Sequence, residues 1–432
     1  MNEVKRRNGS DKTAAHIVVP ILRSPGGPSD ACRRRKETVG LAEAINLEVR
    51  KVDEVKLSCI QPATLFGSGK NQEIAEIIKS EEIKVSIVDY PLTPAQQRNL
   101  ELAWRCKVLD RTALILEIFG ARARTYEGRL QVELAALQYQ RSRLVRSWTH
   151  LERQRGGYGF VGGPGESQLE IDRRLTDKRI KKLQVDIEKI RKTRSLHRSS
   201  RTRSSLPTVA LVGYTNAGKS SLFNRLTEST VIAKNMLFAT LDPTMRRMLL
   251  PSGQEVVLCD TVGFISDLPT ELIASFRATL EEIVEADLVL HVQDASAIDV
   301  VEQRLTVEAI VESITIEKPA RMVDIFNKID LVGEDWCSYQ SRTFRGNSVY
   351  LSAITGEGIE KLLDVIATEC ATLREIVIYN IPSTEGAALA WLYKNGEVIS
   401  TKSQNMSSIV KVALQSPDVG RFAHRFSLEP LR

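Results

Sequence analysis

The chain has 432 residues, 42% apolar and 26% charged, with a formal net charge of +6; this composition is ordinary for globular protein and predicts about three domains. Its six cysteines lie far apart and form no Cys-x-x-Cys pair, which indicates reduced thiols in a cytosolic protein rather than a disulfide scaffold. The N-terminus has no apolar signal-peptide core, and no apolar run approaches about 18 residues, so both secretion and stable membrane insertion are disfavoured.

Positive charge is concentrated in one part of the chain. Between Ala121 and Ser205 there are 21 Lys and Arg against 9 Asp and Glu, a net charge of +12, so the remaining residues sum to about −6. A segregated basic block is typical of proteins that bind a polyanion such as nucleic acid. The alternative is a solvated helical face, although helices with mixed charges usually run closer to neutral.

Residues 1 to 112 alternate strand-like and helix-like runs, which predicts a small α/β domain. The expected strands are His16–Ile21 and Lys84–Val88, and the expected helices are Asn71–Lys79 and Pro94–Trp104, the last with Thr93 as its N-cap. Gly67-Ser68-Gly69-Lys70 is similar to half of a phosphate loop. It lacks the four-residue spacing before Gly-Lys, so a plain turn is favoured over a second nucleotide site.

Residues 113 to 205 are predicted to form a basic helical hairpin that ends in a linker. Leucines 130, 134, 137 and 144 fall at heptad spacing, as do Ile180, Leu183, Ile187 and Ile190, and the glycine-rich stretch 156–166 lies between the two runs. Residues 191–205 lose apolar periodicity and are expected to be a basic linker. A basic tip that carries aromatic rings suits stacking on unpaired RNA bases; a turn in a protein-binding coiled coil is the alternative. The candidate RNA contacts are Arg153, Arg155, Tyr158, Phe160, Arg173 and Arg174.

Residues 206 to 373 carry a phosphate-loop motif. The apolar run Thr208–Val212 predicts a buried strand, and Gly-x-x-x-x-Gly-Lys-Ser follows it directly. Its glycines let backbone N–H groups face a polyphosphate at a helix N-terminus. Lys219 would reach the β- and γ-phosphates, and Ser220 would ligate Mg²⁺. The expected nucleotide-binding residues here are Gly213, Tyr214, Thr215, Asn216, Ala217, Gly218, Lys219 and Ser220.

Three further motifs follow predicted strands of a doubly wound α/β sheet. The further strands of this sheet are Glu255–Cys259, Leu288–Val292, Met322–Phe326 and Ser348–Leu351, and the motifs follow the first, third and fourth of them. A helix over Gly358–Cys370 closes the domain. Asp260 would hold Mg²⁺ through water, and the Gly263 N–H would meet the γ-phosphate. A carboxylate at Asp330 would accept two hydrogen bonds from guanine, which selects GTP over ATP. The motif residues are Asp260, Thr261, Val262 and Gly263; Asn327, Lys328, Ile329 and Asp330; and Ser352, Ala353 and Ile354.

A threonine between the phosphate loop and Asp260 is expected to sense the γ-phosphate. Thr240 would complete the Mg²⁺ shell only with GTP, which makes its loop a switch, and Lys219, Thr240 and Gly263 are the expected catalytic groups. Phe264 stands where many GTPases have a water-orienting glutamine, so intrinsic turnover should be slow. The remaining residues expected at the nucleotide from this loop are Phe238, Ala239, Leu241 and Asp242.

Three smaller predictions complete the chain. Asn216 occupies a phosphate-loop position where K⁺ could bind in place of an arginine finger. His291 lies inside a strand, and a core histidine is favoured over a catalytic base. Residues 374 to 432 predict a small α+β tail domain, with a hairpin turn at Lys394-Asn395-Gly396 and a strand at Ile409–Leu414. We expect a monomer.

These residues resemble the HflX family, of the Obg–HflX branch of translational GTPases. The resemblance runs from about Gly67 to the end of the GTPase domain and includes K-V-L-D-R-T-A-L-I-L-E-I-F, G-Y-T-N-A-G-K-S-S-L-F-N, F-A-T-L-D-P-T and D-T-V-G-F-I. The stretch G-G-P-G-E-S-Q-L-E-I-D-R-R before that domain is the most specific. The family also lacks the switch glutamine, in agreement with Phe264.

The resemblance implies a cytoplasmic GTPase that uses Mg²⁺, binds the large ribosomal subunit and separates stalled or idle ribosomes. The helical hairpin would contact rRNA, a role in ribosome biogenesis stays open, and some family members use ATP in the N-terminal region. The alternative is a GTP-dependent switch whose coiled coil binds a protein partner.

Overall fold

The computed structural model describes residues 12–22, 27–154, 168–202, 206–227, 237–238, 240, 243–266, 282–315, 321–333, 348–372, 374–404 and 406–431. The chain divides into two compact units. The first comprises residues 1–188, 234–242 and 265–277, and the second comprises residues 189–233, 243–264 and 278–432. The predicted division into parts 1–112, 113–205, 206–373 and 374–432 stays a prediction.

The first unit begins with a parallel four-stranded sheet in the order β2-β1-β3-β4. Its strands are β1 (Thr13–Leu22), β2 (Leu47–Leu57), β3 (Val85–Val88) and β4 (Lys107–Asp110). The apolar centre of β1 is almost completely buried, as expected for a central strand with helices on both faces. Helices α1 (Gly27–Ala44) and α4 (Arg111–Arg122) pack together against the sheet, and α2 (Ser68–Ser80) packs on α3 (Pro94–Trp104).

Local sequence signals explain how two of these helices begin. Thr93 caps α3 through a complete capping box with Gln96, as its Thr-Pro start predicts. Ser68 opens α2, so the Gly67–Lys70 stretch is the start of a helix, and Lys70 pairs with Glu73 of the same helix at 2.7 Å. This local pair is consistent with the interpretation of Gly67–Lys70 as a plain turn that leads into a helix, which the sequence favours over a second nucleotide site.

An ion network is buried at the carboxyl end of this first sheet. Arg111 donates to Asp89 and to Glu37, each at 2.8 Å, and Arg34 donates to Asp89 at 2.9 Å. Burial alone would lower the pKa of Arg111, but the carboxylates of Glu37 and Asp89 raise it above its ordinary value. Arg111 and Glu37 also hold Ser266, through its carbonyl and hydroxyl, at 2.9 Å each. The network therefore joins charged side chains from three segments and links them to a fourth segment at Ser266.

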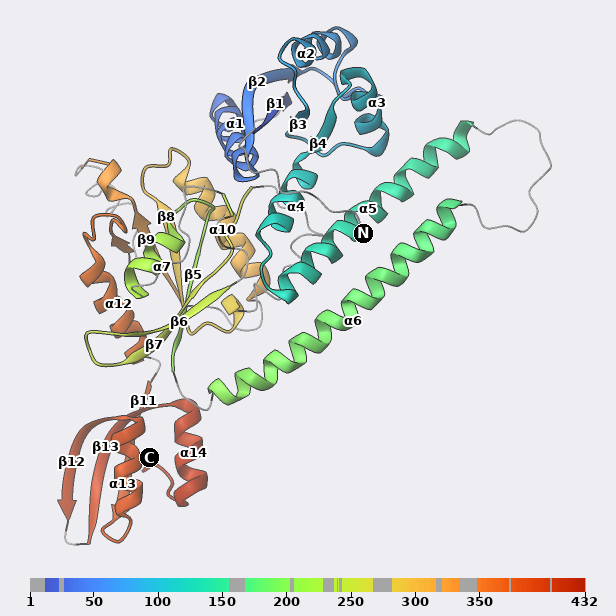
Figure 1. The fold of residues 1–432 in the computed structure, drawn as a ribbon. Helices are drawn as coiled ribbons and strands as arrows, with labels where there is room; N and C mark the ends of the chain where they lie inside the picture. Colours follow the sequence, from blue (N-terminus) through green and yellow to red (C-terminus); the bar gives the residue numbers. More distant parts are fainter. Residues whose placement is uncertain are drawn as a thin grey trace. The chain divides into compact units, whose positions relative to one another are not determined.

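Two long helices form the predicted hairpin, α5 (Tyr126–Gln154) and α6 (Gln168–Thr202). They run antiparallel and side by side (Figure 1), joined by an ion pair between Glu133 and Arg179 at 2.6 Å and another between Arg141 and Asp177 at 3.2 Å. Heptad residues are buried on both helices, Leu130 and Leu134 on α5 and Ile180 and Leu183 on α6.

The middle of α5 is tied to the end of the first sheet. Tyr139 donates its hydroxyl to both oxygens of Asp110 at 2.8 Å, and Arg143 donates to the same carboxylate at 3.2 Å. Burial raises the pKa of Tyr139 above its usual value, and the Asp110 charge adds to this. Asp110 also caps α4, accepting from the Ala113 N–H at 2.8 Å. One carboxylate thus links the start of α4 to the middle of α5.

The linker predicted over residues 191–205 is wrong for most of its length, because α6 continues to Thr202. Arg and Lys have good helix propensity, and a helix can continue without an apolar repeat when its preceding turns are already formed. The loss of apolar periodicity therefore did not mark the end of the helix. No described helix is long and apolar enough to span a membrane.

The second unit contains a six-stranded sheet in the order β10-β9-β8-β5-β7-β6, parallel except for the edge strand β6. The strands are β5 (Thr208–Gly213), β6 (Thr244–Leu249), β7 (Glu255–Asp260), β8 (Leu288–Asp294), β9 (Met322–Asn327) and β10 (Ser348–Tyr350). Helices α7 (Lys219–Thr227) and α12 (Ile359–Thr372) share one core with the sheet. Helix α10 (Val300–Ile314) contacts β8 and β5. The predicted doubly wound P-loop sheet is confirmed.

The tail forms a three-stranded antiparallel sheet in the order β11-β13-β12. It comprises β11 (Arg374–Pro382), α13 (Gly386–Asn395), β12 (Glu397–Gln404), β13 (Ser407–Gln415) and α14 (Ser416–Phe426). The predicted hairpin turn at Lys394-Asn395-Gly396 is wrong: Asn395 ends α13 and Gly396 is its C-cap. Gly396 is extended, and a Cβ there would lie 2.5 Å from Cδ2 of Leu414, so glycine fits this helix end for reasons of space. Leu392 is buried in the core formed with α14. The hairpin instead joins β12 and β13.

Candidate nucleotide site

The loop between β5 and α7 has the close packing that a phosphate loop needs. Gly213 has a φ of +152°, and a Cβ there would lie 2.1 Å from the Val292 carbonyl oxygen. Gly218 has a φ of +93°, and a Cβ there would lie 2.2 Å from Nδ2 of Asn327. Only glycine fits both the backbone conformation and the space at these two positions. The two glycines of the motif therefore let the loop lie directly on the sheet edge.

Lys219 is buried with its ammonium against the loop. Its Nζ donates to the carbonyl oxygens of Gly213 at 3.1 Å and Tyr214 at 2.8 Å. Burial lowers the pKa of Lys219 to about 8, while the Asp260 carboxylate acts in the opposite direction. Phosphate oxygens would stabilise this ammonium more than neutral carbonyls do. The Lys219 ammonium is therefore already positioned at the loop where a phosphate would bind.

Oxygen atoms suited to Mg²⁺ meet at the end of β7. Ser220 donates from Oγ to Oδ2 of Asp260 at 2.7 Å, and Asp260 is completely buried. Hydroxyl, carboxylate and water oxygens are the ligands that Mg²⁺ takes in an octahedral shell. The residues present fit a magnesium ion held by Ser220 directly and by Asp260 through water.

Gly263 leaves room beside the lysine. A Cβ at this position would lie 3.0 Å from Nζ of Lys219 and 2.9 Å from Cγ2 of Thr215. The Thr215 hydroxyl is buried and makes no hydrogen bond to any described residue. A bare backbone beside a buried ammonium and a buried hydroxyl suits the approach of a phosphate oxygen.

Phe264 is buried beside the phosphate loop. Its side chain is 2% exposed, and its backbone forms two hydrogen bonds with the phosphate loop, from its N–H to Gly213 at 3.1 Å and from the Thr215 N–H to its carbonyl at 2.7 Å. These two backbone hydrogen bonds hold the D-T-V-G segment against the phosphate loop. A buried ring cannot orient water by hydrogen bonding, as the sequence indicates.

The predicted switch loop is described only in part. Thr240 is half-buried, and its contact with Mg²⁺ stays a prediction; Ala239, Leu241 and Asp242 lie outside the described residues. Phe238 is buried against Phe119 of α4, with ring centroids 4.7 Å apart in an edge-to-face arrangement. Its ring therefore belongs to the core of the first unit, and its contact with nucleotide stays a prediction.

One buried amide joins the three loops that surround the predicted base site. Asn327 donates from Nδ2 to the Ala217 carbonyl at 2.9 Å and accepts at Oδ1 from the Ala353 N–H at 3.0 Å. Asp330 is exposed on the short turn that follows, and Ile354 is 74% exposed beyond Ala353. The sequence motifs are therefore brought to one edge of the sheet, but the Ala353 N–H is already engaged by Asn327.

Asp294 belongs to this edge, although no sequence motif identified it. It ends β8 and accepts from Nζ of Lys328 at 2.6 Å and from the Ser296 hydroxyl at 2.6 Å. Lys328 has a φ of +65°, so this pair helps to hold a backbone conformation that non-glycine residues rarely adopt. The sequence did offer one indication of Asp294: it lies at the carboxyl end of a predicted central parallel strand, where ligands bind in open α/β sheets.

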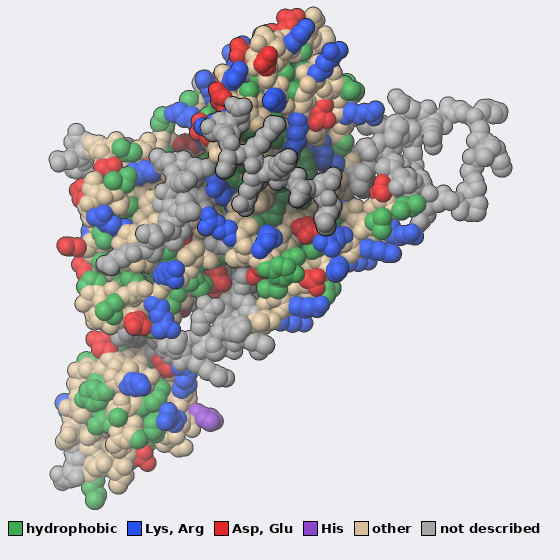
Figure 2. Space-filling model, viewed as in Figure 1, with side chains coloured by type: hydrophobic (Ala, Val, Ile, Leu, Met, Phe, Trp, Pro, Cys, Tyr) green, Lys and Arg blue, Asp and Glu red, His purple; other side chains and the backbone are tan. Residues whose placement is uncertain are grey.

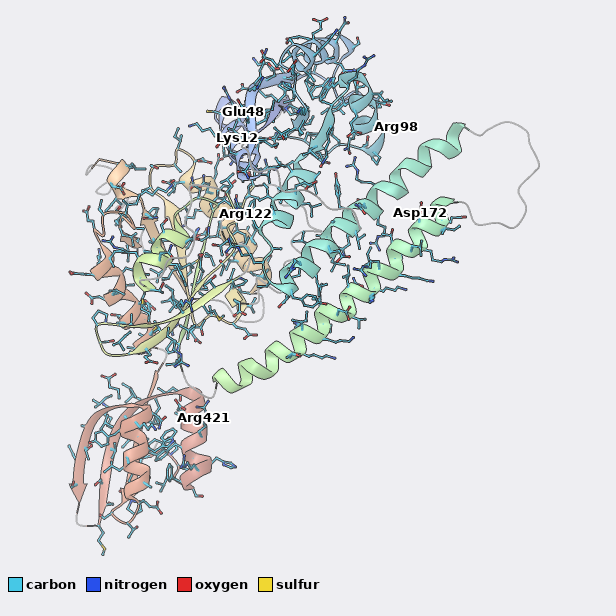
Figure 3. The ribbon with its side chains drawn as sticks, viewed as in Figure 1. Lys12, Glu48, Arg98, Arg122, Asp172 and Arg421 are labelled. Carbon is cyan, nitrogen blue, oxygen red and sulfur yellow. The ribbon has the colours of Figure 1, made fainter. Side chains whose placement is uncertain are left out.

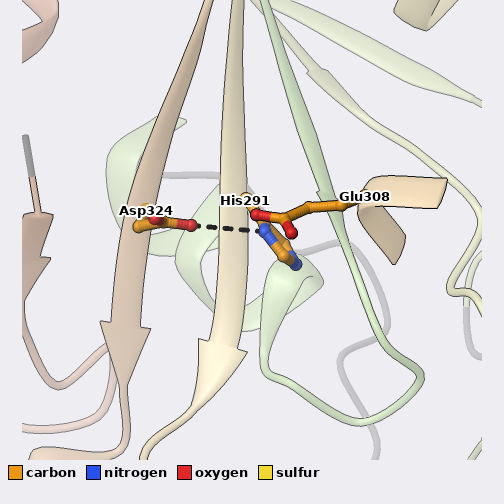
Figure 4. Close-up of side chains that lie close together, drawn as sticks. All are labelled: His291, Glu308 and Asp324. Carbon is orange, nitrogen blue, oxygen red and sulfur yellow. Dashed lines mark ion pairs between the residues drawn. The ribbon is translucent and has the colours of Figure 1, made fainter. Parts of the chain in front are cut away.

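His291, inside β8, lies beside the carboxylates of Asp324 and Glu308 (Figure 4). Its Nδ1 is 3.3 Å from Asp324, and ligand atoms of His291, Asp324 and Glu308 all lie within 4.8 Å of one another. Arg304, however, pairs with Glu308 at 2.8 Å and with Asp324 at 2.9 Å. Because the guanidinium neutralises both carboxylates, the cluster is a structural network and not a metal site. His291 is 1% exposed, as a core histidine should be.

The six candidate RNA contacts fall at the far end of the hairpin from its base. Arg173 and Arg174 are exposed near the start of α6, where Figure 3 labels Asp172. Arg153 lies in α5, where only the backbone is described, and Arg155, Tyr158 and Phe160 lie outside the described residues. Their roles stay predictions.

Four protein families match successive parts of the chain. They are described as "GTP-binding GTPase N-terminal" over residues 33–120, "GTP-binding GTPase Middle Region" over 122–201, "50S ribosome-binding GTPase" over 208–328 and "HflX C-terminal domain" over 339–425.

Curated relatives match over nearly the full length. GTPase HflX of Magnetococcus marinus is 48% identical over 91% of this chain and 90% of its own length. GTPase HflX of Escherichia coli is 45% identical over 83% of this chain and 84% of its own. The match to GTPase HflX of Chlamydia pneumoniae is 41% identical over 88% of this chain and 81% of that protein. The chain therefore belongs to the HflX family of GTP-binding proteins and is a GTPase, of a fold class that works with Mg²⁺.

Proposed function

We propose that this GTPase binds the large ribosomal subunit through rRNA and uses GTP to separate stalled or idle ribosomes. The observation that carries the proposal is the exposed basic face of α6. Exposed Arg173, Arg174, Lys178 and Lys181 surround a surface hollow whose only acidic lining residues are Glu170 and Asp177. Figure 2 shows Lys and Arg side chains gathered along this helix. The match to a family described as "50S ribosome-binding GTPase" supports a ribosomal partner, which would place the protein in the cytoplasm.

The geometry of α6 suits phosphate contacts on one side only. Ile180 and Leu183 are buried on the hairpin side, whereas Arg174, Lys178 and Lys181 recur every three or four residues and so share one exposed face. At about 1.5 Å per residue these cations span about 10 Å, enough for more than one backbone phosphate. Phosphate contacts position a protein on RNA without reading its sequence.

The same site assignments supply the GTP chemistry. In the proposed mechanism Lys219 would neutralise the β- and γ-phosphates, and the Gly263 N–H would meet the γ-phosphate. Ser220 and Thr240 would hold Mg²⁺, with Asp260 acting through water, and the ion would neutralise charge that develops on the phosphates. Guanine is selected by Asp330. Because the buried Phe264 ring supplies no water-orienting group, the bound ribosome would have to complete the site and raise a slow basal rate.

The test compares binding and GTP turnover with purified large subunits. Changing Arg174, Lys178 and Lys181 together to alanine should weaken binding, and the slope of log affinity against log salt should fall by about 2 to 3 units because about three phosphate contacts are lost. Stimulated turnover should fall while basal hydrolysis stays unchanged. A matched variant that removes three exposed lysines from the first sheet region, Lys56, Lys79 and Lys84, controls for net charge.

Two outcomes would contradict the proposal. Full stimulation and an unchanged salt slope in the α6 variant would show that this face does not meet RNA. Binding that resists ribonuclease and salt would favour the second candidate, a GTP-dependent switch whose coiled coil binds a protein. Splitting itself is measured as conversion of 70S particles to subunits on a sucrose gradient, and it should require GTP or a non-hydrolysable analogue.

A finer proposal concerns K⁺. Asn216 is exposed in the phosphate loop with a φ of +62°, so its side chain stands at the surface where a monovalent cation could sit beside the phosphates. Turnover should then be faster in K⁺ than in Na⁺ buffer, and Asn216→Ala should remove the difference. Equal rates in the two salts would dismiss this proposal.

A further inference from the structure

An arginine of the phosphate-loop helix contacts the loop that follows β10. Arg225, in the second turn of α7, donates from Nη1 to the Ile354 carbonyl at 3.4 Å and from Nη2 to the Thr355 carbonyl at 3.2 Å. Both contacts link residues about 130 positions apart in the sequence. They lie within the second compact unit.

The loop is shaped to receive this guanidinium. It closes on itself through three hydrogen bonds, from the Thr355 N–H to the Ser352 hydroxyl at 3.1 Å, from the Gly356 N–H to the Ser352 carbonyl at 2.9 Å and from the Ser352 N–H to the Glu357 carbonyl at 3.0 Å. Gly356 has a φ of +93°, and a Cβ there would lie 2.2 Å from Nη2 of Arg225. A glycine is therefore required both for the turn and for the approach of the arginine.

We propose that Arg225 is a positioning residue for the loop that receives the guanine base. The inference rests on the proposed assignment of Ser352, Ala353 and Ile354 to that loop. Asn327 fixes the Ala353 N–H from the sheet side, and Arg225 fixes the next two carbonyls from the helix side. Because α7 opens with Lys219 and Ser220, one short helix then sets the distance between the phosphate-binding and base-binding parts of the site.

Arg225→Ala should weaken binding of GDP and GTP by the same factor, about 5- to 10-fold, since the two lost hydrogen bonds are near solvent and modest in strength. The loss should be seen as faster nucleotide release. KM for GTP should rise equally while kcat at saturation stays unchanged, because the loop makes the same base contacts before and during hydrolysis. Arg225→Lys, which can reach one carbonyl, should recover part of the affinity.

The decisive comparison uses pyrophosphate, which occupies the phosphate loop and has no base. Displacement of a fluorescent GDP by unlabelled GDP and by pyrophosphate should show a 5- to 10-fold loss for GDP and no change for pyrophosphate in Arg225→Ala. Arg246→Ala, which removes an exposed arginine from β6, is the matched control and should change neither.

Two results would overturn the inference. An unchanged GDP affinity would show that the two contacts do not matter, and an equal loss for pyrophosphate would show that the substitution damages the phosphate-loop helix itself. Failure of the underlying base-site assignment is seen separately, because Asp330→Asn would then not shift preference towards xanthosine diphosphate. The ribosomal proposal is tested without either variant.

Discussion

Asn327→Ala should loosen the nucleotide site as a whole, because this one side chain joins three loops. Asn327 is 2% exposed, donates to the Ala217 carbonyl at 2.9 Å and accepts from the Ala353 N–H at 3.0 Å. Truncation removes both hydrogen bonds and leaves a buried donor and a buried acceptor without a partner. Each such group costs about 1–3 kcal/mol, so a combined loss of about 2–4 kcal/mol is expected after partial relaxation.

Both hydrogen bonds are present without nucleotide, so this loss lowers the stability of the sheet edge that carries the site. Hydrogen exchange of β5 and β9 amides, corrected for intrinsic rates, measures it. Asn380→Ala, at an exposed asparagine of β11, is the matched control. A loss of less than about 1 kcal/mol in Asn327→Ala would refute the reasoning, since two buried unpaired groups cannot cost so little.

Other perturbations test the base, the switch and the first sheet. Asp330→Asn should shift preference from GTP towards xanthosine triphosphate, because an amide can pair with the xanthine carbonyl; a mutant that still prefers GTP would disprove the assignment. Thr240→Ala should slow Mg²⁺-dependent hydrolysis and spare GDP binding, since GDP lacks the γ-phosphate, and an equal loss of GDP affinity would contradict the switch role. Burial lowers the pKa of His16 despite its hydrogen bond to Asp53 at 2.8 Å; the unfolded chain therefore takes up a proton first as pH falls below about 6.5, and stability should drop by up to about 1.4 kcal/mol per pH unit there. Hydrogen exchange of β1 amides, corrected for intrinsic rates, should show this loss in the wild type and not in His16→Gln.

Local patterns in the sequence were enough for the GTP motifs and many elements. Gly-x-x-x-x-Gly-Lys-Ser requires its strand before and its helix after, and β5 and α7 lie there. Thr93-Pro94 predicts the start of α3 because a cap and a fixed φ act on neighbouring residues only. Such features depend on a few adjacent side chains, so one sequence suffices to read them.

Two local predictions failed, each for its own reason. Residues 191–202 continue α6 although their apolar period is lost, because Arg and Lys have good helix propensity and the preceding turns are already formed. Asn395-Gly396 ends a helix although the pair suits a hairpin, because Leu392 of that helix is buried in the core of the tail.

Long-range contacts could not be read from the sequence at all. Arg111 meets Glu37, Asp89 and the Ser266 carbonyl from separate segments, and Arg225 reaches the loop at Thr355. No periodicity or motif marks these partners, because each contact exists only once the strands have paired and the helices have packed. The sequence by itself determined what chemistry the chain carries, and the tertiary structure decided which side chains hold that chemistry in place, since a hydrogen bond between distant residues needs a fold to bring its two atoms within about 3 Å.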